Sequence, residues 1–211
     1  MNRREFALTT TAACLAGLST PLWAQGGPLV EGTDFKRVAQ PLPVSEGKVD
    51  VVEFFGYWCP HCSAFEPQLD AWVKKQPAQV VFRRMAVAFN AAHEPLQRLY
   101  FAIESLGQVD TLHRKVFAAI HVQKTRLNTD AEITEWLKTA SADASKISDA
   151  MKSFSVATKL RQSRTLAEGY KIDGVPTLGI QGRFMTSPSI AGTAERALMV
   201  ADTLIAQVRK A

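Results

Sequence analysis

The sequence predicts an α/β fold in which a block of helices interrupts a β-sheet, and three observations support this. The run Val49–Phe55 is almost continuously apolar, which is typical of a strand buried on both faces. A helical pattern and a second apolar run at residues 79–89 follow it, and this order indicates a parallel pair with a right-handed crossover. Residues 93–170 then show helical periodicity without a strand signal, before strand patterns resume at Thr177–Ile180.

The first part of the sheet is expected to form as follows. Residues 25–48 are rich in Gly and Pro, so we expect an irregular lead-in with one short edge strand. The helix after Val49–Phe55 is expected to begin at Pro60, because a proline at the first helical position has no paired N–H to lose. Its apolar residues recur at helical spacing, and Pro67 within it is expected to produce a kink.

The middle block, residues 93–170, is expected to hold about five helices, each with one apolar stripe. The residues Thr129 and Glu132 form a capping box that marks the start of the third of these helices. The residues assigned to the inward stripes are Leu96, Leu99, Tyr100, Ile103, Leu112, Val116, Ile120, Ile133, Trp136, Leu137, Ile147, Met151, Phe154, Leu160, Leu166 and Tyr170.

The sheet is expected to be completed by the C-terminal part of the chain. Strands at Thr177–Ile180 and residues 183–185 flank Gln181-Gly182, which is a hairpin signal, and a last helix is expected over residues 191–209. These elements predict two domains. Residues 25–92 and 171–211 would form one discontinuous α/β domain, and residues 93–170 would form a helical domain inserted into it.

The composition is that of an ordinary globular protein. The chain has 211 residues, 46% hydrophobic and 21% charged, and a formal net charge of +5. Because no dense block of Lys or Arg is present, we expect no nucleic-acid partner.

The N-terminal residues 1–24 have the features of an export signal. Arg3 and Arg4 supply the positive charge, a weakly apolar stretch follows, and cleavage is expected near Ala24. The two arginines also resemble the twin-arginine export motif, so both that route and ordinary Sec export stay open. No other segment is long and apolar enough to span a bilayer.

Cysteine usage indicates a reactive site. Of the three cysteines, Cys14 lies within the expected signal, so the exported chain would keep only Cys59 and Cys62. One adjacent pair provides no disulfide framework for an exported protein, and the pair is therefore predicted to be a reagent. The alternative, half of a zinc site, lacks two further ligands at a suitable spacing, so we expect neither a metal nor another cofactor.

The position of the pair predicts its chemistry. Cys59 stands just outside a helix start, where unpaired backbone N–H groups and the positive helix end favour the thiolate and lower its pKa. His61 between the cysteines can add a positive charge or a hydrogen bond. Because a low-pKa sulfur is a good leaving group, Pro60-His61 points to a pair that donates its disulfide. Cys62, one turn into the helix, is expected to be the shielded resolving thiol.

Four residues near the pair are candidates for supporting roles. Glu53 is a carboxylate in a buried strand, where burial raises its pKa, so it could relay a proton to or from Cys62. An ion pair between Glu53 and Arg84 is the alternative, and the two are compatible. Tyr57 and Trp58 either bind apolar, unfolded chains at the surface or pack into the core.

Several motifs together resemble the DsbA family of periplasmic disulfide oxidases over residues 30–211. They are Glu53-Phe54-Phe55, Cys59-Pro60-His61-Cys62, Phe65-Glu66 and Gly174-Val175-Pro176-Thr177. The resemblance implies a thioredoxin fold with an inserted all-helical domain, a nucleophilic Cys59, a resolving Cys62 and a buried acid at Glu53.

The resemblance also implies a cis bond between Val175 and Pro176, where the chain alone would favour an ordinary trans loop proline. Such a bond would turn a backbone edge toward the cysteines, free to pair with an extended peptide. A membrane reoxidase of the DsbB type is implied as partner. Pro67 departs from the family pattern, and Arg84 would stand as the basic partner of the buried acid.

The sequence therefore predicts a monomeric, periplasmic thiol:disulfide oxidase acting on unfolded exported proteins with free cysteines. A disulfide isomerase or reductase is the alternative, but such enzymes usually carry a dimerisation domain, and only residues 25–48 precede the first main strand. A binding protein with an incidental cysteine pair and a glutathione-dependent isomerase of small molecules are further alternatives.

Overall fold

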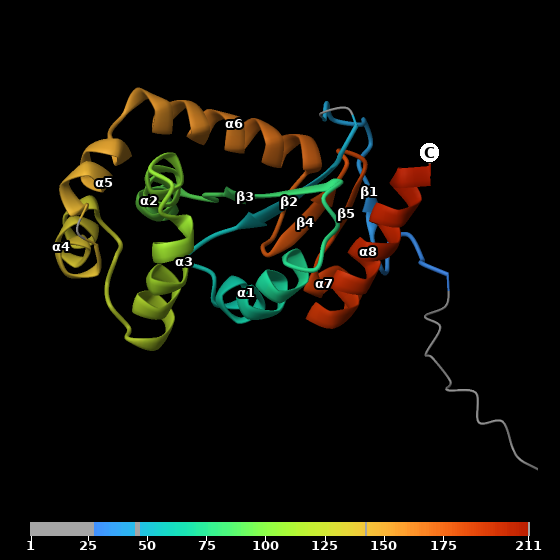
Figure 1. The fold of residues 1–211 in the computed structure, drawn as a ribbon, viewed down its shortest axis with the longest axis horizontal. Helices are drawn as coiled ribbons and strands as arrows, with labels where there is room; N and C mark the ends of the chain where they lie inside the picture. Colours follow the sequence, from blue (N-terminus) through green and yellow to red (C-terminus); the bar gives the residue numbers. More distant parts are fainter. Residues whose placement is uncertain (1–27, 45–46, 142, 211) are drawn as a thin grey trace, which may run out of the picture.

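The computed structural model describes residues 28–44, 47–141 and 143–210 (Figure 1). The expected export signal, its cleavage near Ala24 and Cys14 lie outside the described residues. Within the described part of the chain, no helix is both long and apolar enough to cross a membrane.

The sheet has five strands in the order β1-β5-β4-β2-β3. The strand β2 (Val49–Phe55) pairs in parallel with the edge strand β3 (Val80–Ala86) and antiparallel with the central strand β4 (Thr177–Ile180). Beyond β4 lie β5 (Phe184–Thr186) and the short β1 (Lys36–Arg37). The predicted edge strand, the parallel pair and the bounds of β2 and β4 are confirmed.

The helix α1 (Pro60–Val73) connects β2 to β3 and begins after the short loop that follows β2. Pro60 occupies the first turn, as predicted, because no helical hydrogen bond requires its N–H there. Pro67 lies inside α1 without ending it. The apolar stripe Phe65, Leu69 and Trp72 is buried, as the helical spacing predicts.

Two element boundaries differ from the prediction. The second strand ends at Ala86 and does not reach Phe89, because the chain turns away after Val87 and leaves Phe89 45% exposed. The strand expected at residues 183–185 is instead β5, one residue later, because Gln181 and Gly182 both adopt positive φ in the tight turn.

The predicted last helix is two helices, α7 (Pro188–Ala191) and α8 (Ala194–Lys210). Gly192 adopts a φ of 91° between them, a conformation that a helix cannot continue through. Thr193 then accepts a hydrogen bond from the backbone N–H of Arg196 and so starts the second helix.

The five predicted helices between β3 and β4 are confirmed: α2 (Glu94–Ser105), α3 (Val109–Phe117), α4 (Asp130–Ala140), α5 (Ala144–Met151) and α6 (Phe154–Tyr170). A short 3-10 turn, η1 (Ala91–His93), precedes α2, and a π-helical turn, η2 (Ala118–Val122), continues α3. The capping box of Thr129 and Glu132 is present at the start of α4. Phe154 was assigned wrongly to a core stripe: as the first residue of α6 it is 80% exposed.

The sheet is covered on both faces (Figure 1). One face, with Val49 and Val51, packs against α1 and α8. The other, with Val52 and Phe54, packs against the helices between β3 and β4, including Tyr170 of α6. Glu53 takes the α1 side by strand alternation, and the parallel register places it opposite Arg84.

Candidate active site

The two cysteines lie where the sheet meets α1. Cys59 is the N-cap residue of α1 with an extended backbone, and Cys62 lies in the first helical turn. Both are free thiols; Cys59 is 3% exposed and Cys62 is fully buried. The turn after β2 is closed by a hydrogen bond from the Cys59 N–H to the Gly56 carbonyl, at 3.0 Å. The end of β2 thus places the sulfur of Cys59 at the N-terminus of α1, and α1 buries the sulfur of Cys62.

The two sulfurs differ strongly in acidity. A hydrogen bond from the Cys62 thiol lowers the pKa of Cys59 to about 6, assisted by the backbone N–H groups of Cys62 and His61 and by the charge of His61, while burial opposes it. Burial and the same hydrogen bond raise the pKa of Cys62 far above its ordinary value. The pair therefore holds one thiolate and one thiol near neutral pH.

The loop before β4 faces this pair. The Val175–Pro176 bond is cis, as the resemblance implies, and the carbonyl oxygen of Val175 lies 3.4 Å from Sγ of Cys59. A hollow of about 440 Å³ adjoins the loop. Its lining includes His61, Ala64, Phe65, Val175, Pro176 and Pro188. His61 and Pro60 are exposed at its edge.

The two aromatic residues before the pair lie in different environments. The half-buried Trp58 stacks on the ring of His93 with centroids 3.9 Å apart, and its indole N–H reaches the Val87 carbonyl at 3.3 Å. Of the two alternatives for Tyr57, substrate binding is wrong and core packing is present, because the side chain is only 1% exposed and packs among aromatic rings. Of the two, only Trp58 is placed to contact another molecule.

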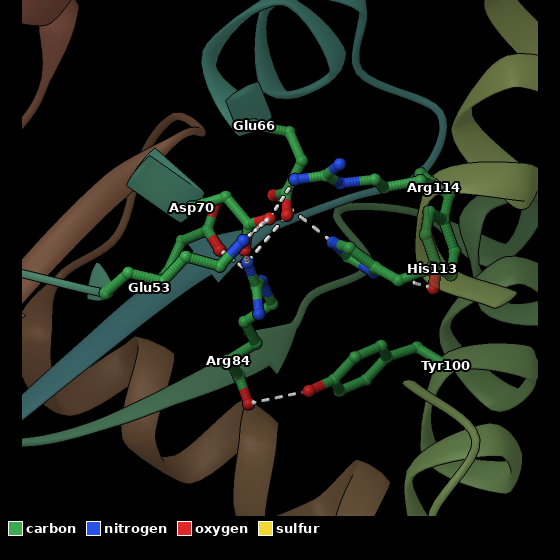
Figure 2. A network of polar contacts seen from close by, with 9 residues as sticks. Glu53, Glu66, Asp70, Arg84, Tyr100, His113 and Arg114 are labelled. Atoms are coloured by element: carbon green, nitrogen blue, oxygen red, sulfur yellow. Dashed lines mark hydrogen bonds and ion pairs between the residues drawn. The ribbon is translucent and has the colours of Figure 1, made fainter. Parts of the chain in front are cut away.

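A cluster of charged side chains gathers around Arg84 (Figure 2). Glu53, 1% exposed, has its Oε2 3.2 Å from Nε of Arg84, so the predicted ion pair is present. Arg84 also binds Glu66 at 2.6 Å and approaches Asp70 at 3.5 Å. Glu66 in turn lies 3.2 Å from Nε2 of His113.

The environment of Glu53 favours its protonated form. Burial, together with the charge of Glu66, raises the pKa of Glu53 to about 8, although Arg84 acts in the opposite direction. The pKa of the Glu53 carboxyl is therefore raised, as predicted, and the same carboxyl contacts Arg84.

The sequence analysis missed part of this cluster. No role was predicted for His113, and Glu66 appeared only as part of a motif. One signal was available: Glu66 and Asp70 are one helical turn apart and border the buried stripe of α1, which is unusual for two carboxylates. No pattern pointed to His113, which comes from α3. Among the described residues, no group of three or more His, Cys, Asp or Glu is arranged to hold a metal ion.

Comparisons with known proteins agree with this site. The family described as DSBA-like thioredoxin domain matches residues 84–196, and the thioredoxin family matches residues 32–97. The thiol:disulfide interchange protein DsbA of Bordetella parapertussis is 40% identical over 100% of both chains. The protein of the same name from Burkholderia cepacia is 40% identical, covering 96% of this chain and 97% of its own.

Solved structures are similar over most of the chain. The crystal structure of Pseudomonas aeruginosa DsbA superimposes with a TM-score of 0.81 at 34% identity, covering 85% of this chain and 94% of its own. The oxidoreductase NmDsbA1 from N. meningitidis gives a TM-score of 0.77 at 30% identity, covering 86% and 95%.

The thioredoxin fold, the cis-proline loop and the unequal thiol pair define a thiol:disulfide oxidoreductase. Full-length identity to the named relatives and the matching solved structures narrow this class further. The chain belongs to the DsbA family, and its activity is that of a thiol:disulfide oxidase; the isomerase or reductase alternative is not favoured.

Proposed function

We propose that Cys59 and Cys62 are the redox centre and that their disulfide is donated to unfolded exported proteins. A substrate thiolate attacks Sγ of Cys59, the Cys59–Cys62 bond breaks, and a mixed disulfide forms. A second substrate thiolate then attacks the substrate sulfur of that bond and displaces Cys59. The substrate loses two electrons, which the cysteine pair gains, so no bound cofactor is needed.

The observation that carries this proposal is the unequal acidity of the two sulfurs. With a pKa of about 6, Cys59 is largely a thiolate at neutral pH, and a stabilised thiolate stabilises the reduced pair relative to the disulfide. The exchange equilibrium between the cysteine pair and a substrate therefore favours transfer of the disulfide to the substrate. His61 contributes through its charge and backbone N–H, and Pro60 by starting the helix.

Glu53 acts in this proposal as the acid that protonates Cys62 when it leaves. A carboxyl with a pKa of about 8 still carries its proton at neutral pH, and once Glu53 is ionised its charge is among the causes that raise the pKa of Cys62. The leaving thiolate is buried, so protonation removes an unpaired charge from the interior.

Substrate would be held beside Cys59 by the Val175–Pro176 loop and by the hollow of about 440 Å³ that adjoins it. The backbone edge of Val175 suits pairing with an extended chain. Trp58, half-buried at the other side of Cys59, supplies an apolar contact.

We further propose that the protein is a periplasmic monomer, exported with a signal cleaved near Ala24, and that a membrane reoxidase of the DsbB type restores its disulfide. The bounds of the helical insertion, residues 93–170 within residues 25–92 and 171–211, belong to the same proposal. The similarity of this chain to proteins named thiol:disulfide interchange protein supports the proposed location and reoxidation. The succession of helices from α2 to α6 supports the bounds of the helical insertion.

The test is the redox equilibrium of the pair against glutathione, together with oxidation of a peptide that carries two cysteines. We expect the disulfide to be reduced by modest amounts of glutathione and to oxidise the peptide. Cys59→Ser should abolish the oxidation, and Cys62→Ser should accumulate the mixed disulfide with the peptide. A pair that glutathione reduces only with difficulty, or a Cys59→Ser variant that still oxidises the peptide, would contradict the proposal.

A further inference from the structure

Four ionisable side chains form a row in which Glu53, Glu66 and His113 are buried and Arg84 is 13% exposed (Figure 2). They come from four elements: Glu53 from β2, Arg84 from β3, Glu66 from α1 and His113 from α3. The row runs from Glu53 to Arg84 at 3.2 Å, from Arg84 to Glu66 at 2.6 Å and from Glu66 to His113 at 3.2 Å. The side chain of His113 is only 4% exposed, and the mechanism described so far does not use it.

The charges of this row balance only if it holds one proton. Arg84 neutralises one of the two carboxylates, Glu53 and Glu66, and an unpaired buried charge is strongly disfavoured. The extra proton can reside on Glu53 with His113 neutral, or on His113 with both carboxylates ionised. Both arrangements have zero net charge, so the row tolerates either without burying an unbalanced charge.

The contacts of His113 fit both arrangements. Its Nε2 lies 3.2 Å from Oε2 of Glu66, an electrostatic contact in which neither buried atom has a hydrogen bond of good geometry, and its Nδ1 lies 2.8 Å from the hydroxyl of Tyr57. When the imidazole is neutral, Nε2 carries the hydrogen and Nδ1 accepts a hydrogen bond from Tyr57. When it is protonated, Nδ1–H donates to the oxygen of Tyr57 instead, because a hydroxyl can serve in either role.

We propose that His113 is a positioning residue for proton transfer: it takes up a proton from solvent when Glu53 has given its own proton to Cys62, and so keeps the net charge of the row at zero. The inference rests on the acid role of Glu53 proposed above and extends it to the helical part of the chain.

Protons are conserved when Cys62 leaves the disulfide. Glu53 loses its proton to the departing thiolate of Cys62, so an S–H bond forms and an O–H bond breaks. His113 then takes one proton from solvent and becomes an imidazolium, which restores zero net charge in the row. The substrate thiol released that proton to solvent when it became the attacking thiolate. Reoxidation of the pair reverses each transfer.

The structure provides a route to solvent on the side of His113. A cleft of about 320 Å³ is lined by His113, Glu66, Asp70, Arg84, Asp110 and Arg114. Asp70, at its inner edge, pairs with Arg114 and lies 3.8 Å from the ammonium of Lys74. Tyr100 of α2 faces the row from the remaining side through the Arg84 carbonyl, at 3.5 Å. In the part of the chain that the structure describes, these groups and Tyr57 are the titratable and charged side chains that line this cleft or contact His113.

The direction of the pKa shifts agrees with the first arrangement as the resting one. Burial lowers the pKa of His113, while burial and Glu66 raise that of Glu53 to about 8. These directions apply to the pair with free thiols, in which the proton resides on Glu53 near neutral pH, so the imidazolium of His113 forms only while Glu53 is ionised.

The test compares His113→Gln with the unchanged protein in single-turnover oxidation of a two-cysteine peptide between pH 5 and 8. Glutamine can still donate to Glu66 and accept from Tyr57, but it takes no proton. We expect peptide oxidation to be about tenfold slower at neutral pH, the size of effect that one pKa unit represents. At each pH the rate of His113→Gln is divided by the rate of the unchanged protein, because ionisation of the peptide thiol affects both rates equally. We expect this ratio to change with pH.

Two further variants separate proton transfer from loss of packing. In His113→Ala, imidazole added to the buffer can enter the cleft and should restore the rate in proportion to the amount added. Val116→Ala loosens the same helix one turn later without touching the row, and its rate ratio should be flat with pH. A flat ratio for His113→Gln without imidazole rescue, or the same pH dependence in Val116→Ala, would overturn the proposal.

Glu53→Gln distinguishes failure of this inference from failure of the acid role on which it rests. If Glu53→Gln slows the oxidation and His113→Gln does not, only the role of His113 is wrong. If Glu53→Gln has no effect, the acid role is wrong and the inference fails with it. If Glu53 and His113 act in the same proton transfer, the variant that carries both substitutions should be no slower than the slower of the two single variants.

Discussion

The sulfur of Cys59 lies 3.4 Å from the carbonyl oxygen of Val175, a residue that reaches the active site from the far end of the chain. A carbonyl oxygen can accept a hydrogen bond from a thiol but offers nothing to a thiolate. The groups that stabilise the thiolate are therefore those on the α1 side, namely the Cys62 thiol and the N–H groups of the first turn. This arrangement leads to the first prediction.

Alkylation of the reduced protein should occur selectively at Cys59, with a rate that rises through a midpoint near pH 6. Cys62 should stay unmodified in the folded protein, since it is fully buried and its pKa is raised. Mass spectrometry after a pulse of iodoacetamide at each pH measures both. His61→Ala removes one positive charge and should move the midpoint upward. Equal labelling of the two cysteines would contradict the described asymmetry.

The second prediction concerns stability and pH. The pKa of Glu53 rises from 4.5 to about 8 on folding, so the folded state binds this proton more tightly than the unfolded state. The contribution of Glu53 to stability is therefore greatest below pH 4.5 and is lost as pH rises toward about 8.

In Glu53→Gln, this loss should be largely abolished, a difference on the order of a few kcal/mol across the interval. The measurement is urea unfolding of the reduced protein at a series of pH values. Glu135→Gln changes an exposed carboxylate and is the matched control, for which the dependence should remain. An unchanged dependence in Glu53→Gln would show that another group titrates.

The third prediction concerns the contact between α6 and the sheet. A Cβ added at Gly179 of β4 would lie 2.6 Å from the ring of Tyr170 and 2.9 Å from Val52. Gly179→Ala should therefore lower the free energy of unfolding by about 1–3 kcal/mol, the typical cost of overpacking a core. Gly174→Ala is the control, because a Cβ there meets nothing within 4 Å. Equal stability of the two variants in thermal unfolding would argue against this close packing.

The fourth prediction concerns the capping box of α4. Thr129 accepts from the backbone N–H of Glu132 at 3.2 Å, and the Glu132 side chain accepts from the Thr129 N–H at 3.1 Å. Thr129→Ala should cost about 1 kcal/mol of stability in urea unfolding. Thr129→Ser keeps the hydroxyl oxygen and should recover most of the loss. Peptide oxidation should be unaffected, since α4 contributes no residue to the site.

The active site was predictable because most of it is local in the sequence. A continuous apolar run defines β2, Pro60 marks the start of α1, and these two signals place Cys59 at a helix start. The ion pair of Glu53 and Arg84 follows from the parallel register of two recognisable strands. Such features depend on neighbouring residues or on one strand pairing.

The parts that could not be predicted depend on contacts between distant elements. Tyr57 resembles an exposed loop aromatic in the sequence, yet α3 covers it and His113 binds its hydroxyl. Phe154 continues a helical stripe but falls at a helix start that projects into solvent. The break at Gly192 did have a local signal, since glycine followed by threonine is a helix end followed by an N-cap.

Tyr57 is held twice by the same segment of chain. Its hydroxyl is bound by His113, and its backbone carbonyl lies 2.7 Å from Nε2 of His121 in η2. The loop that carries the reactive sulfur is thus anchored to α3 and η2, neither of which lines the hollow beside the Val175–Pro176 loop. A compound that displaced α3 and η2 would disturb the cysteine pair from behind, so inhibitors of this protein need not compete with its substrates.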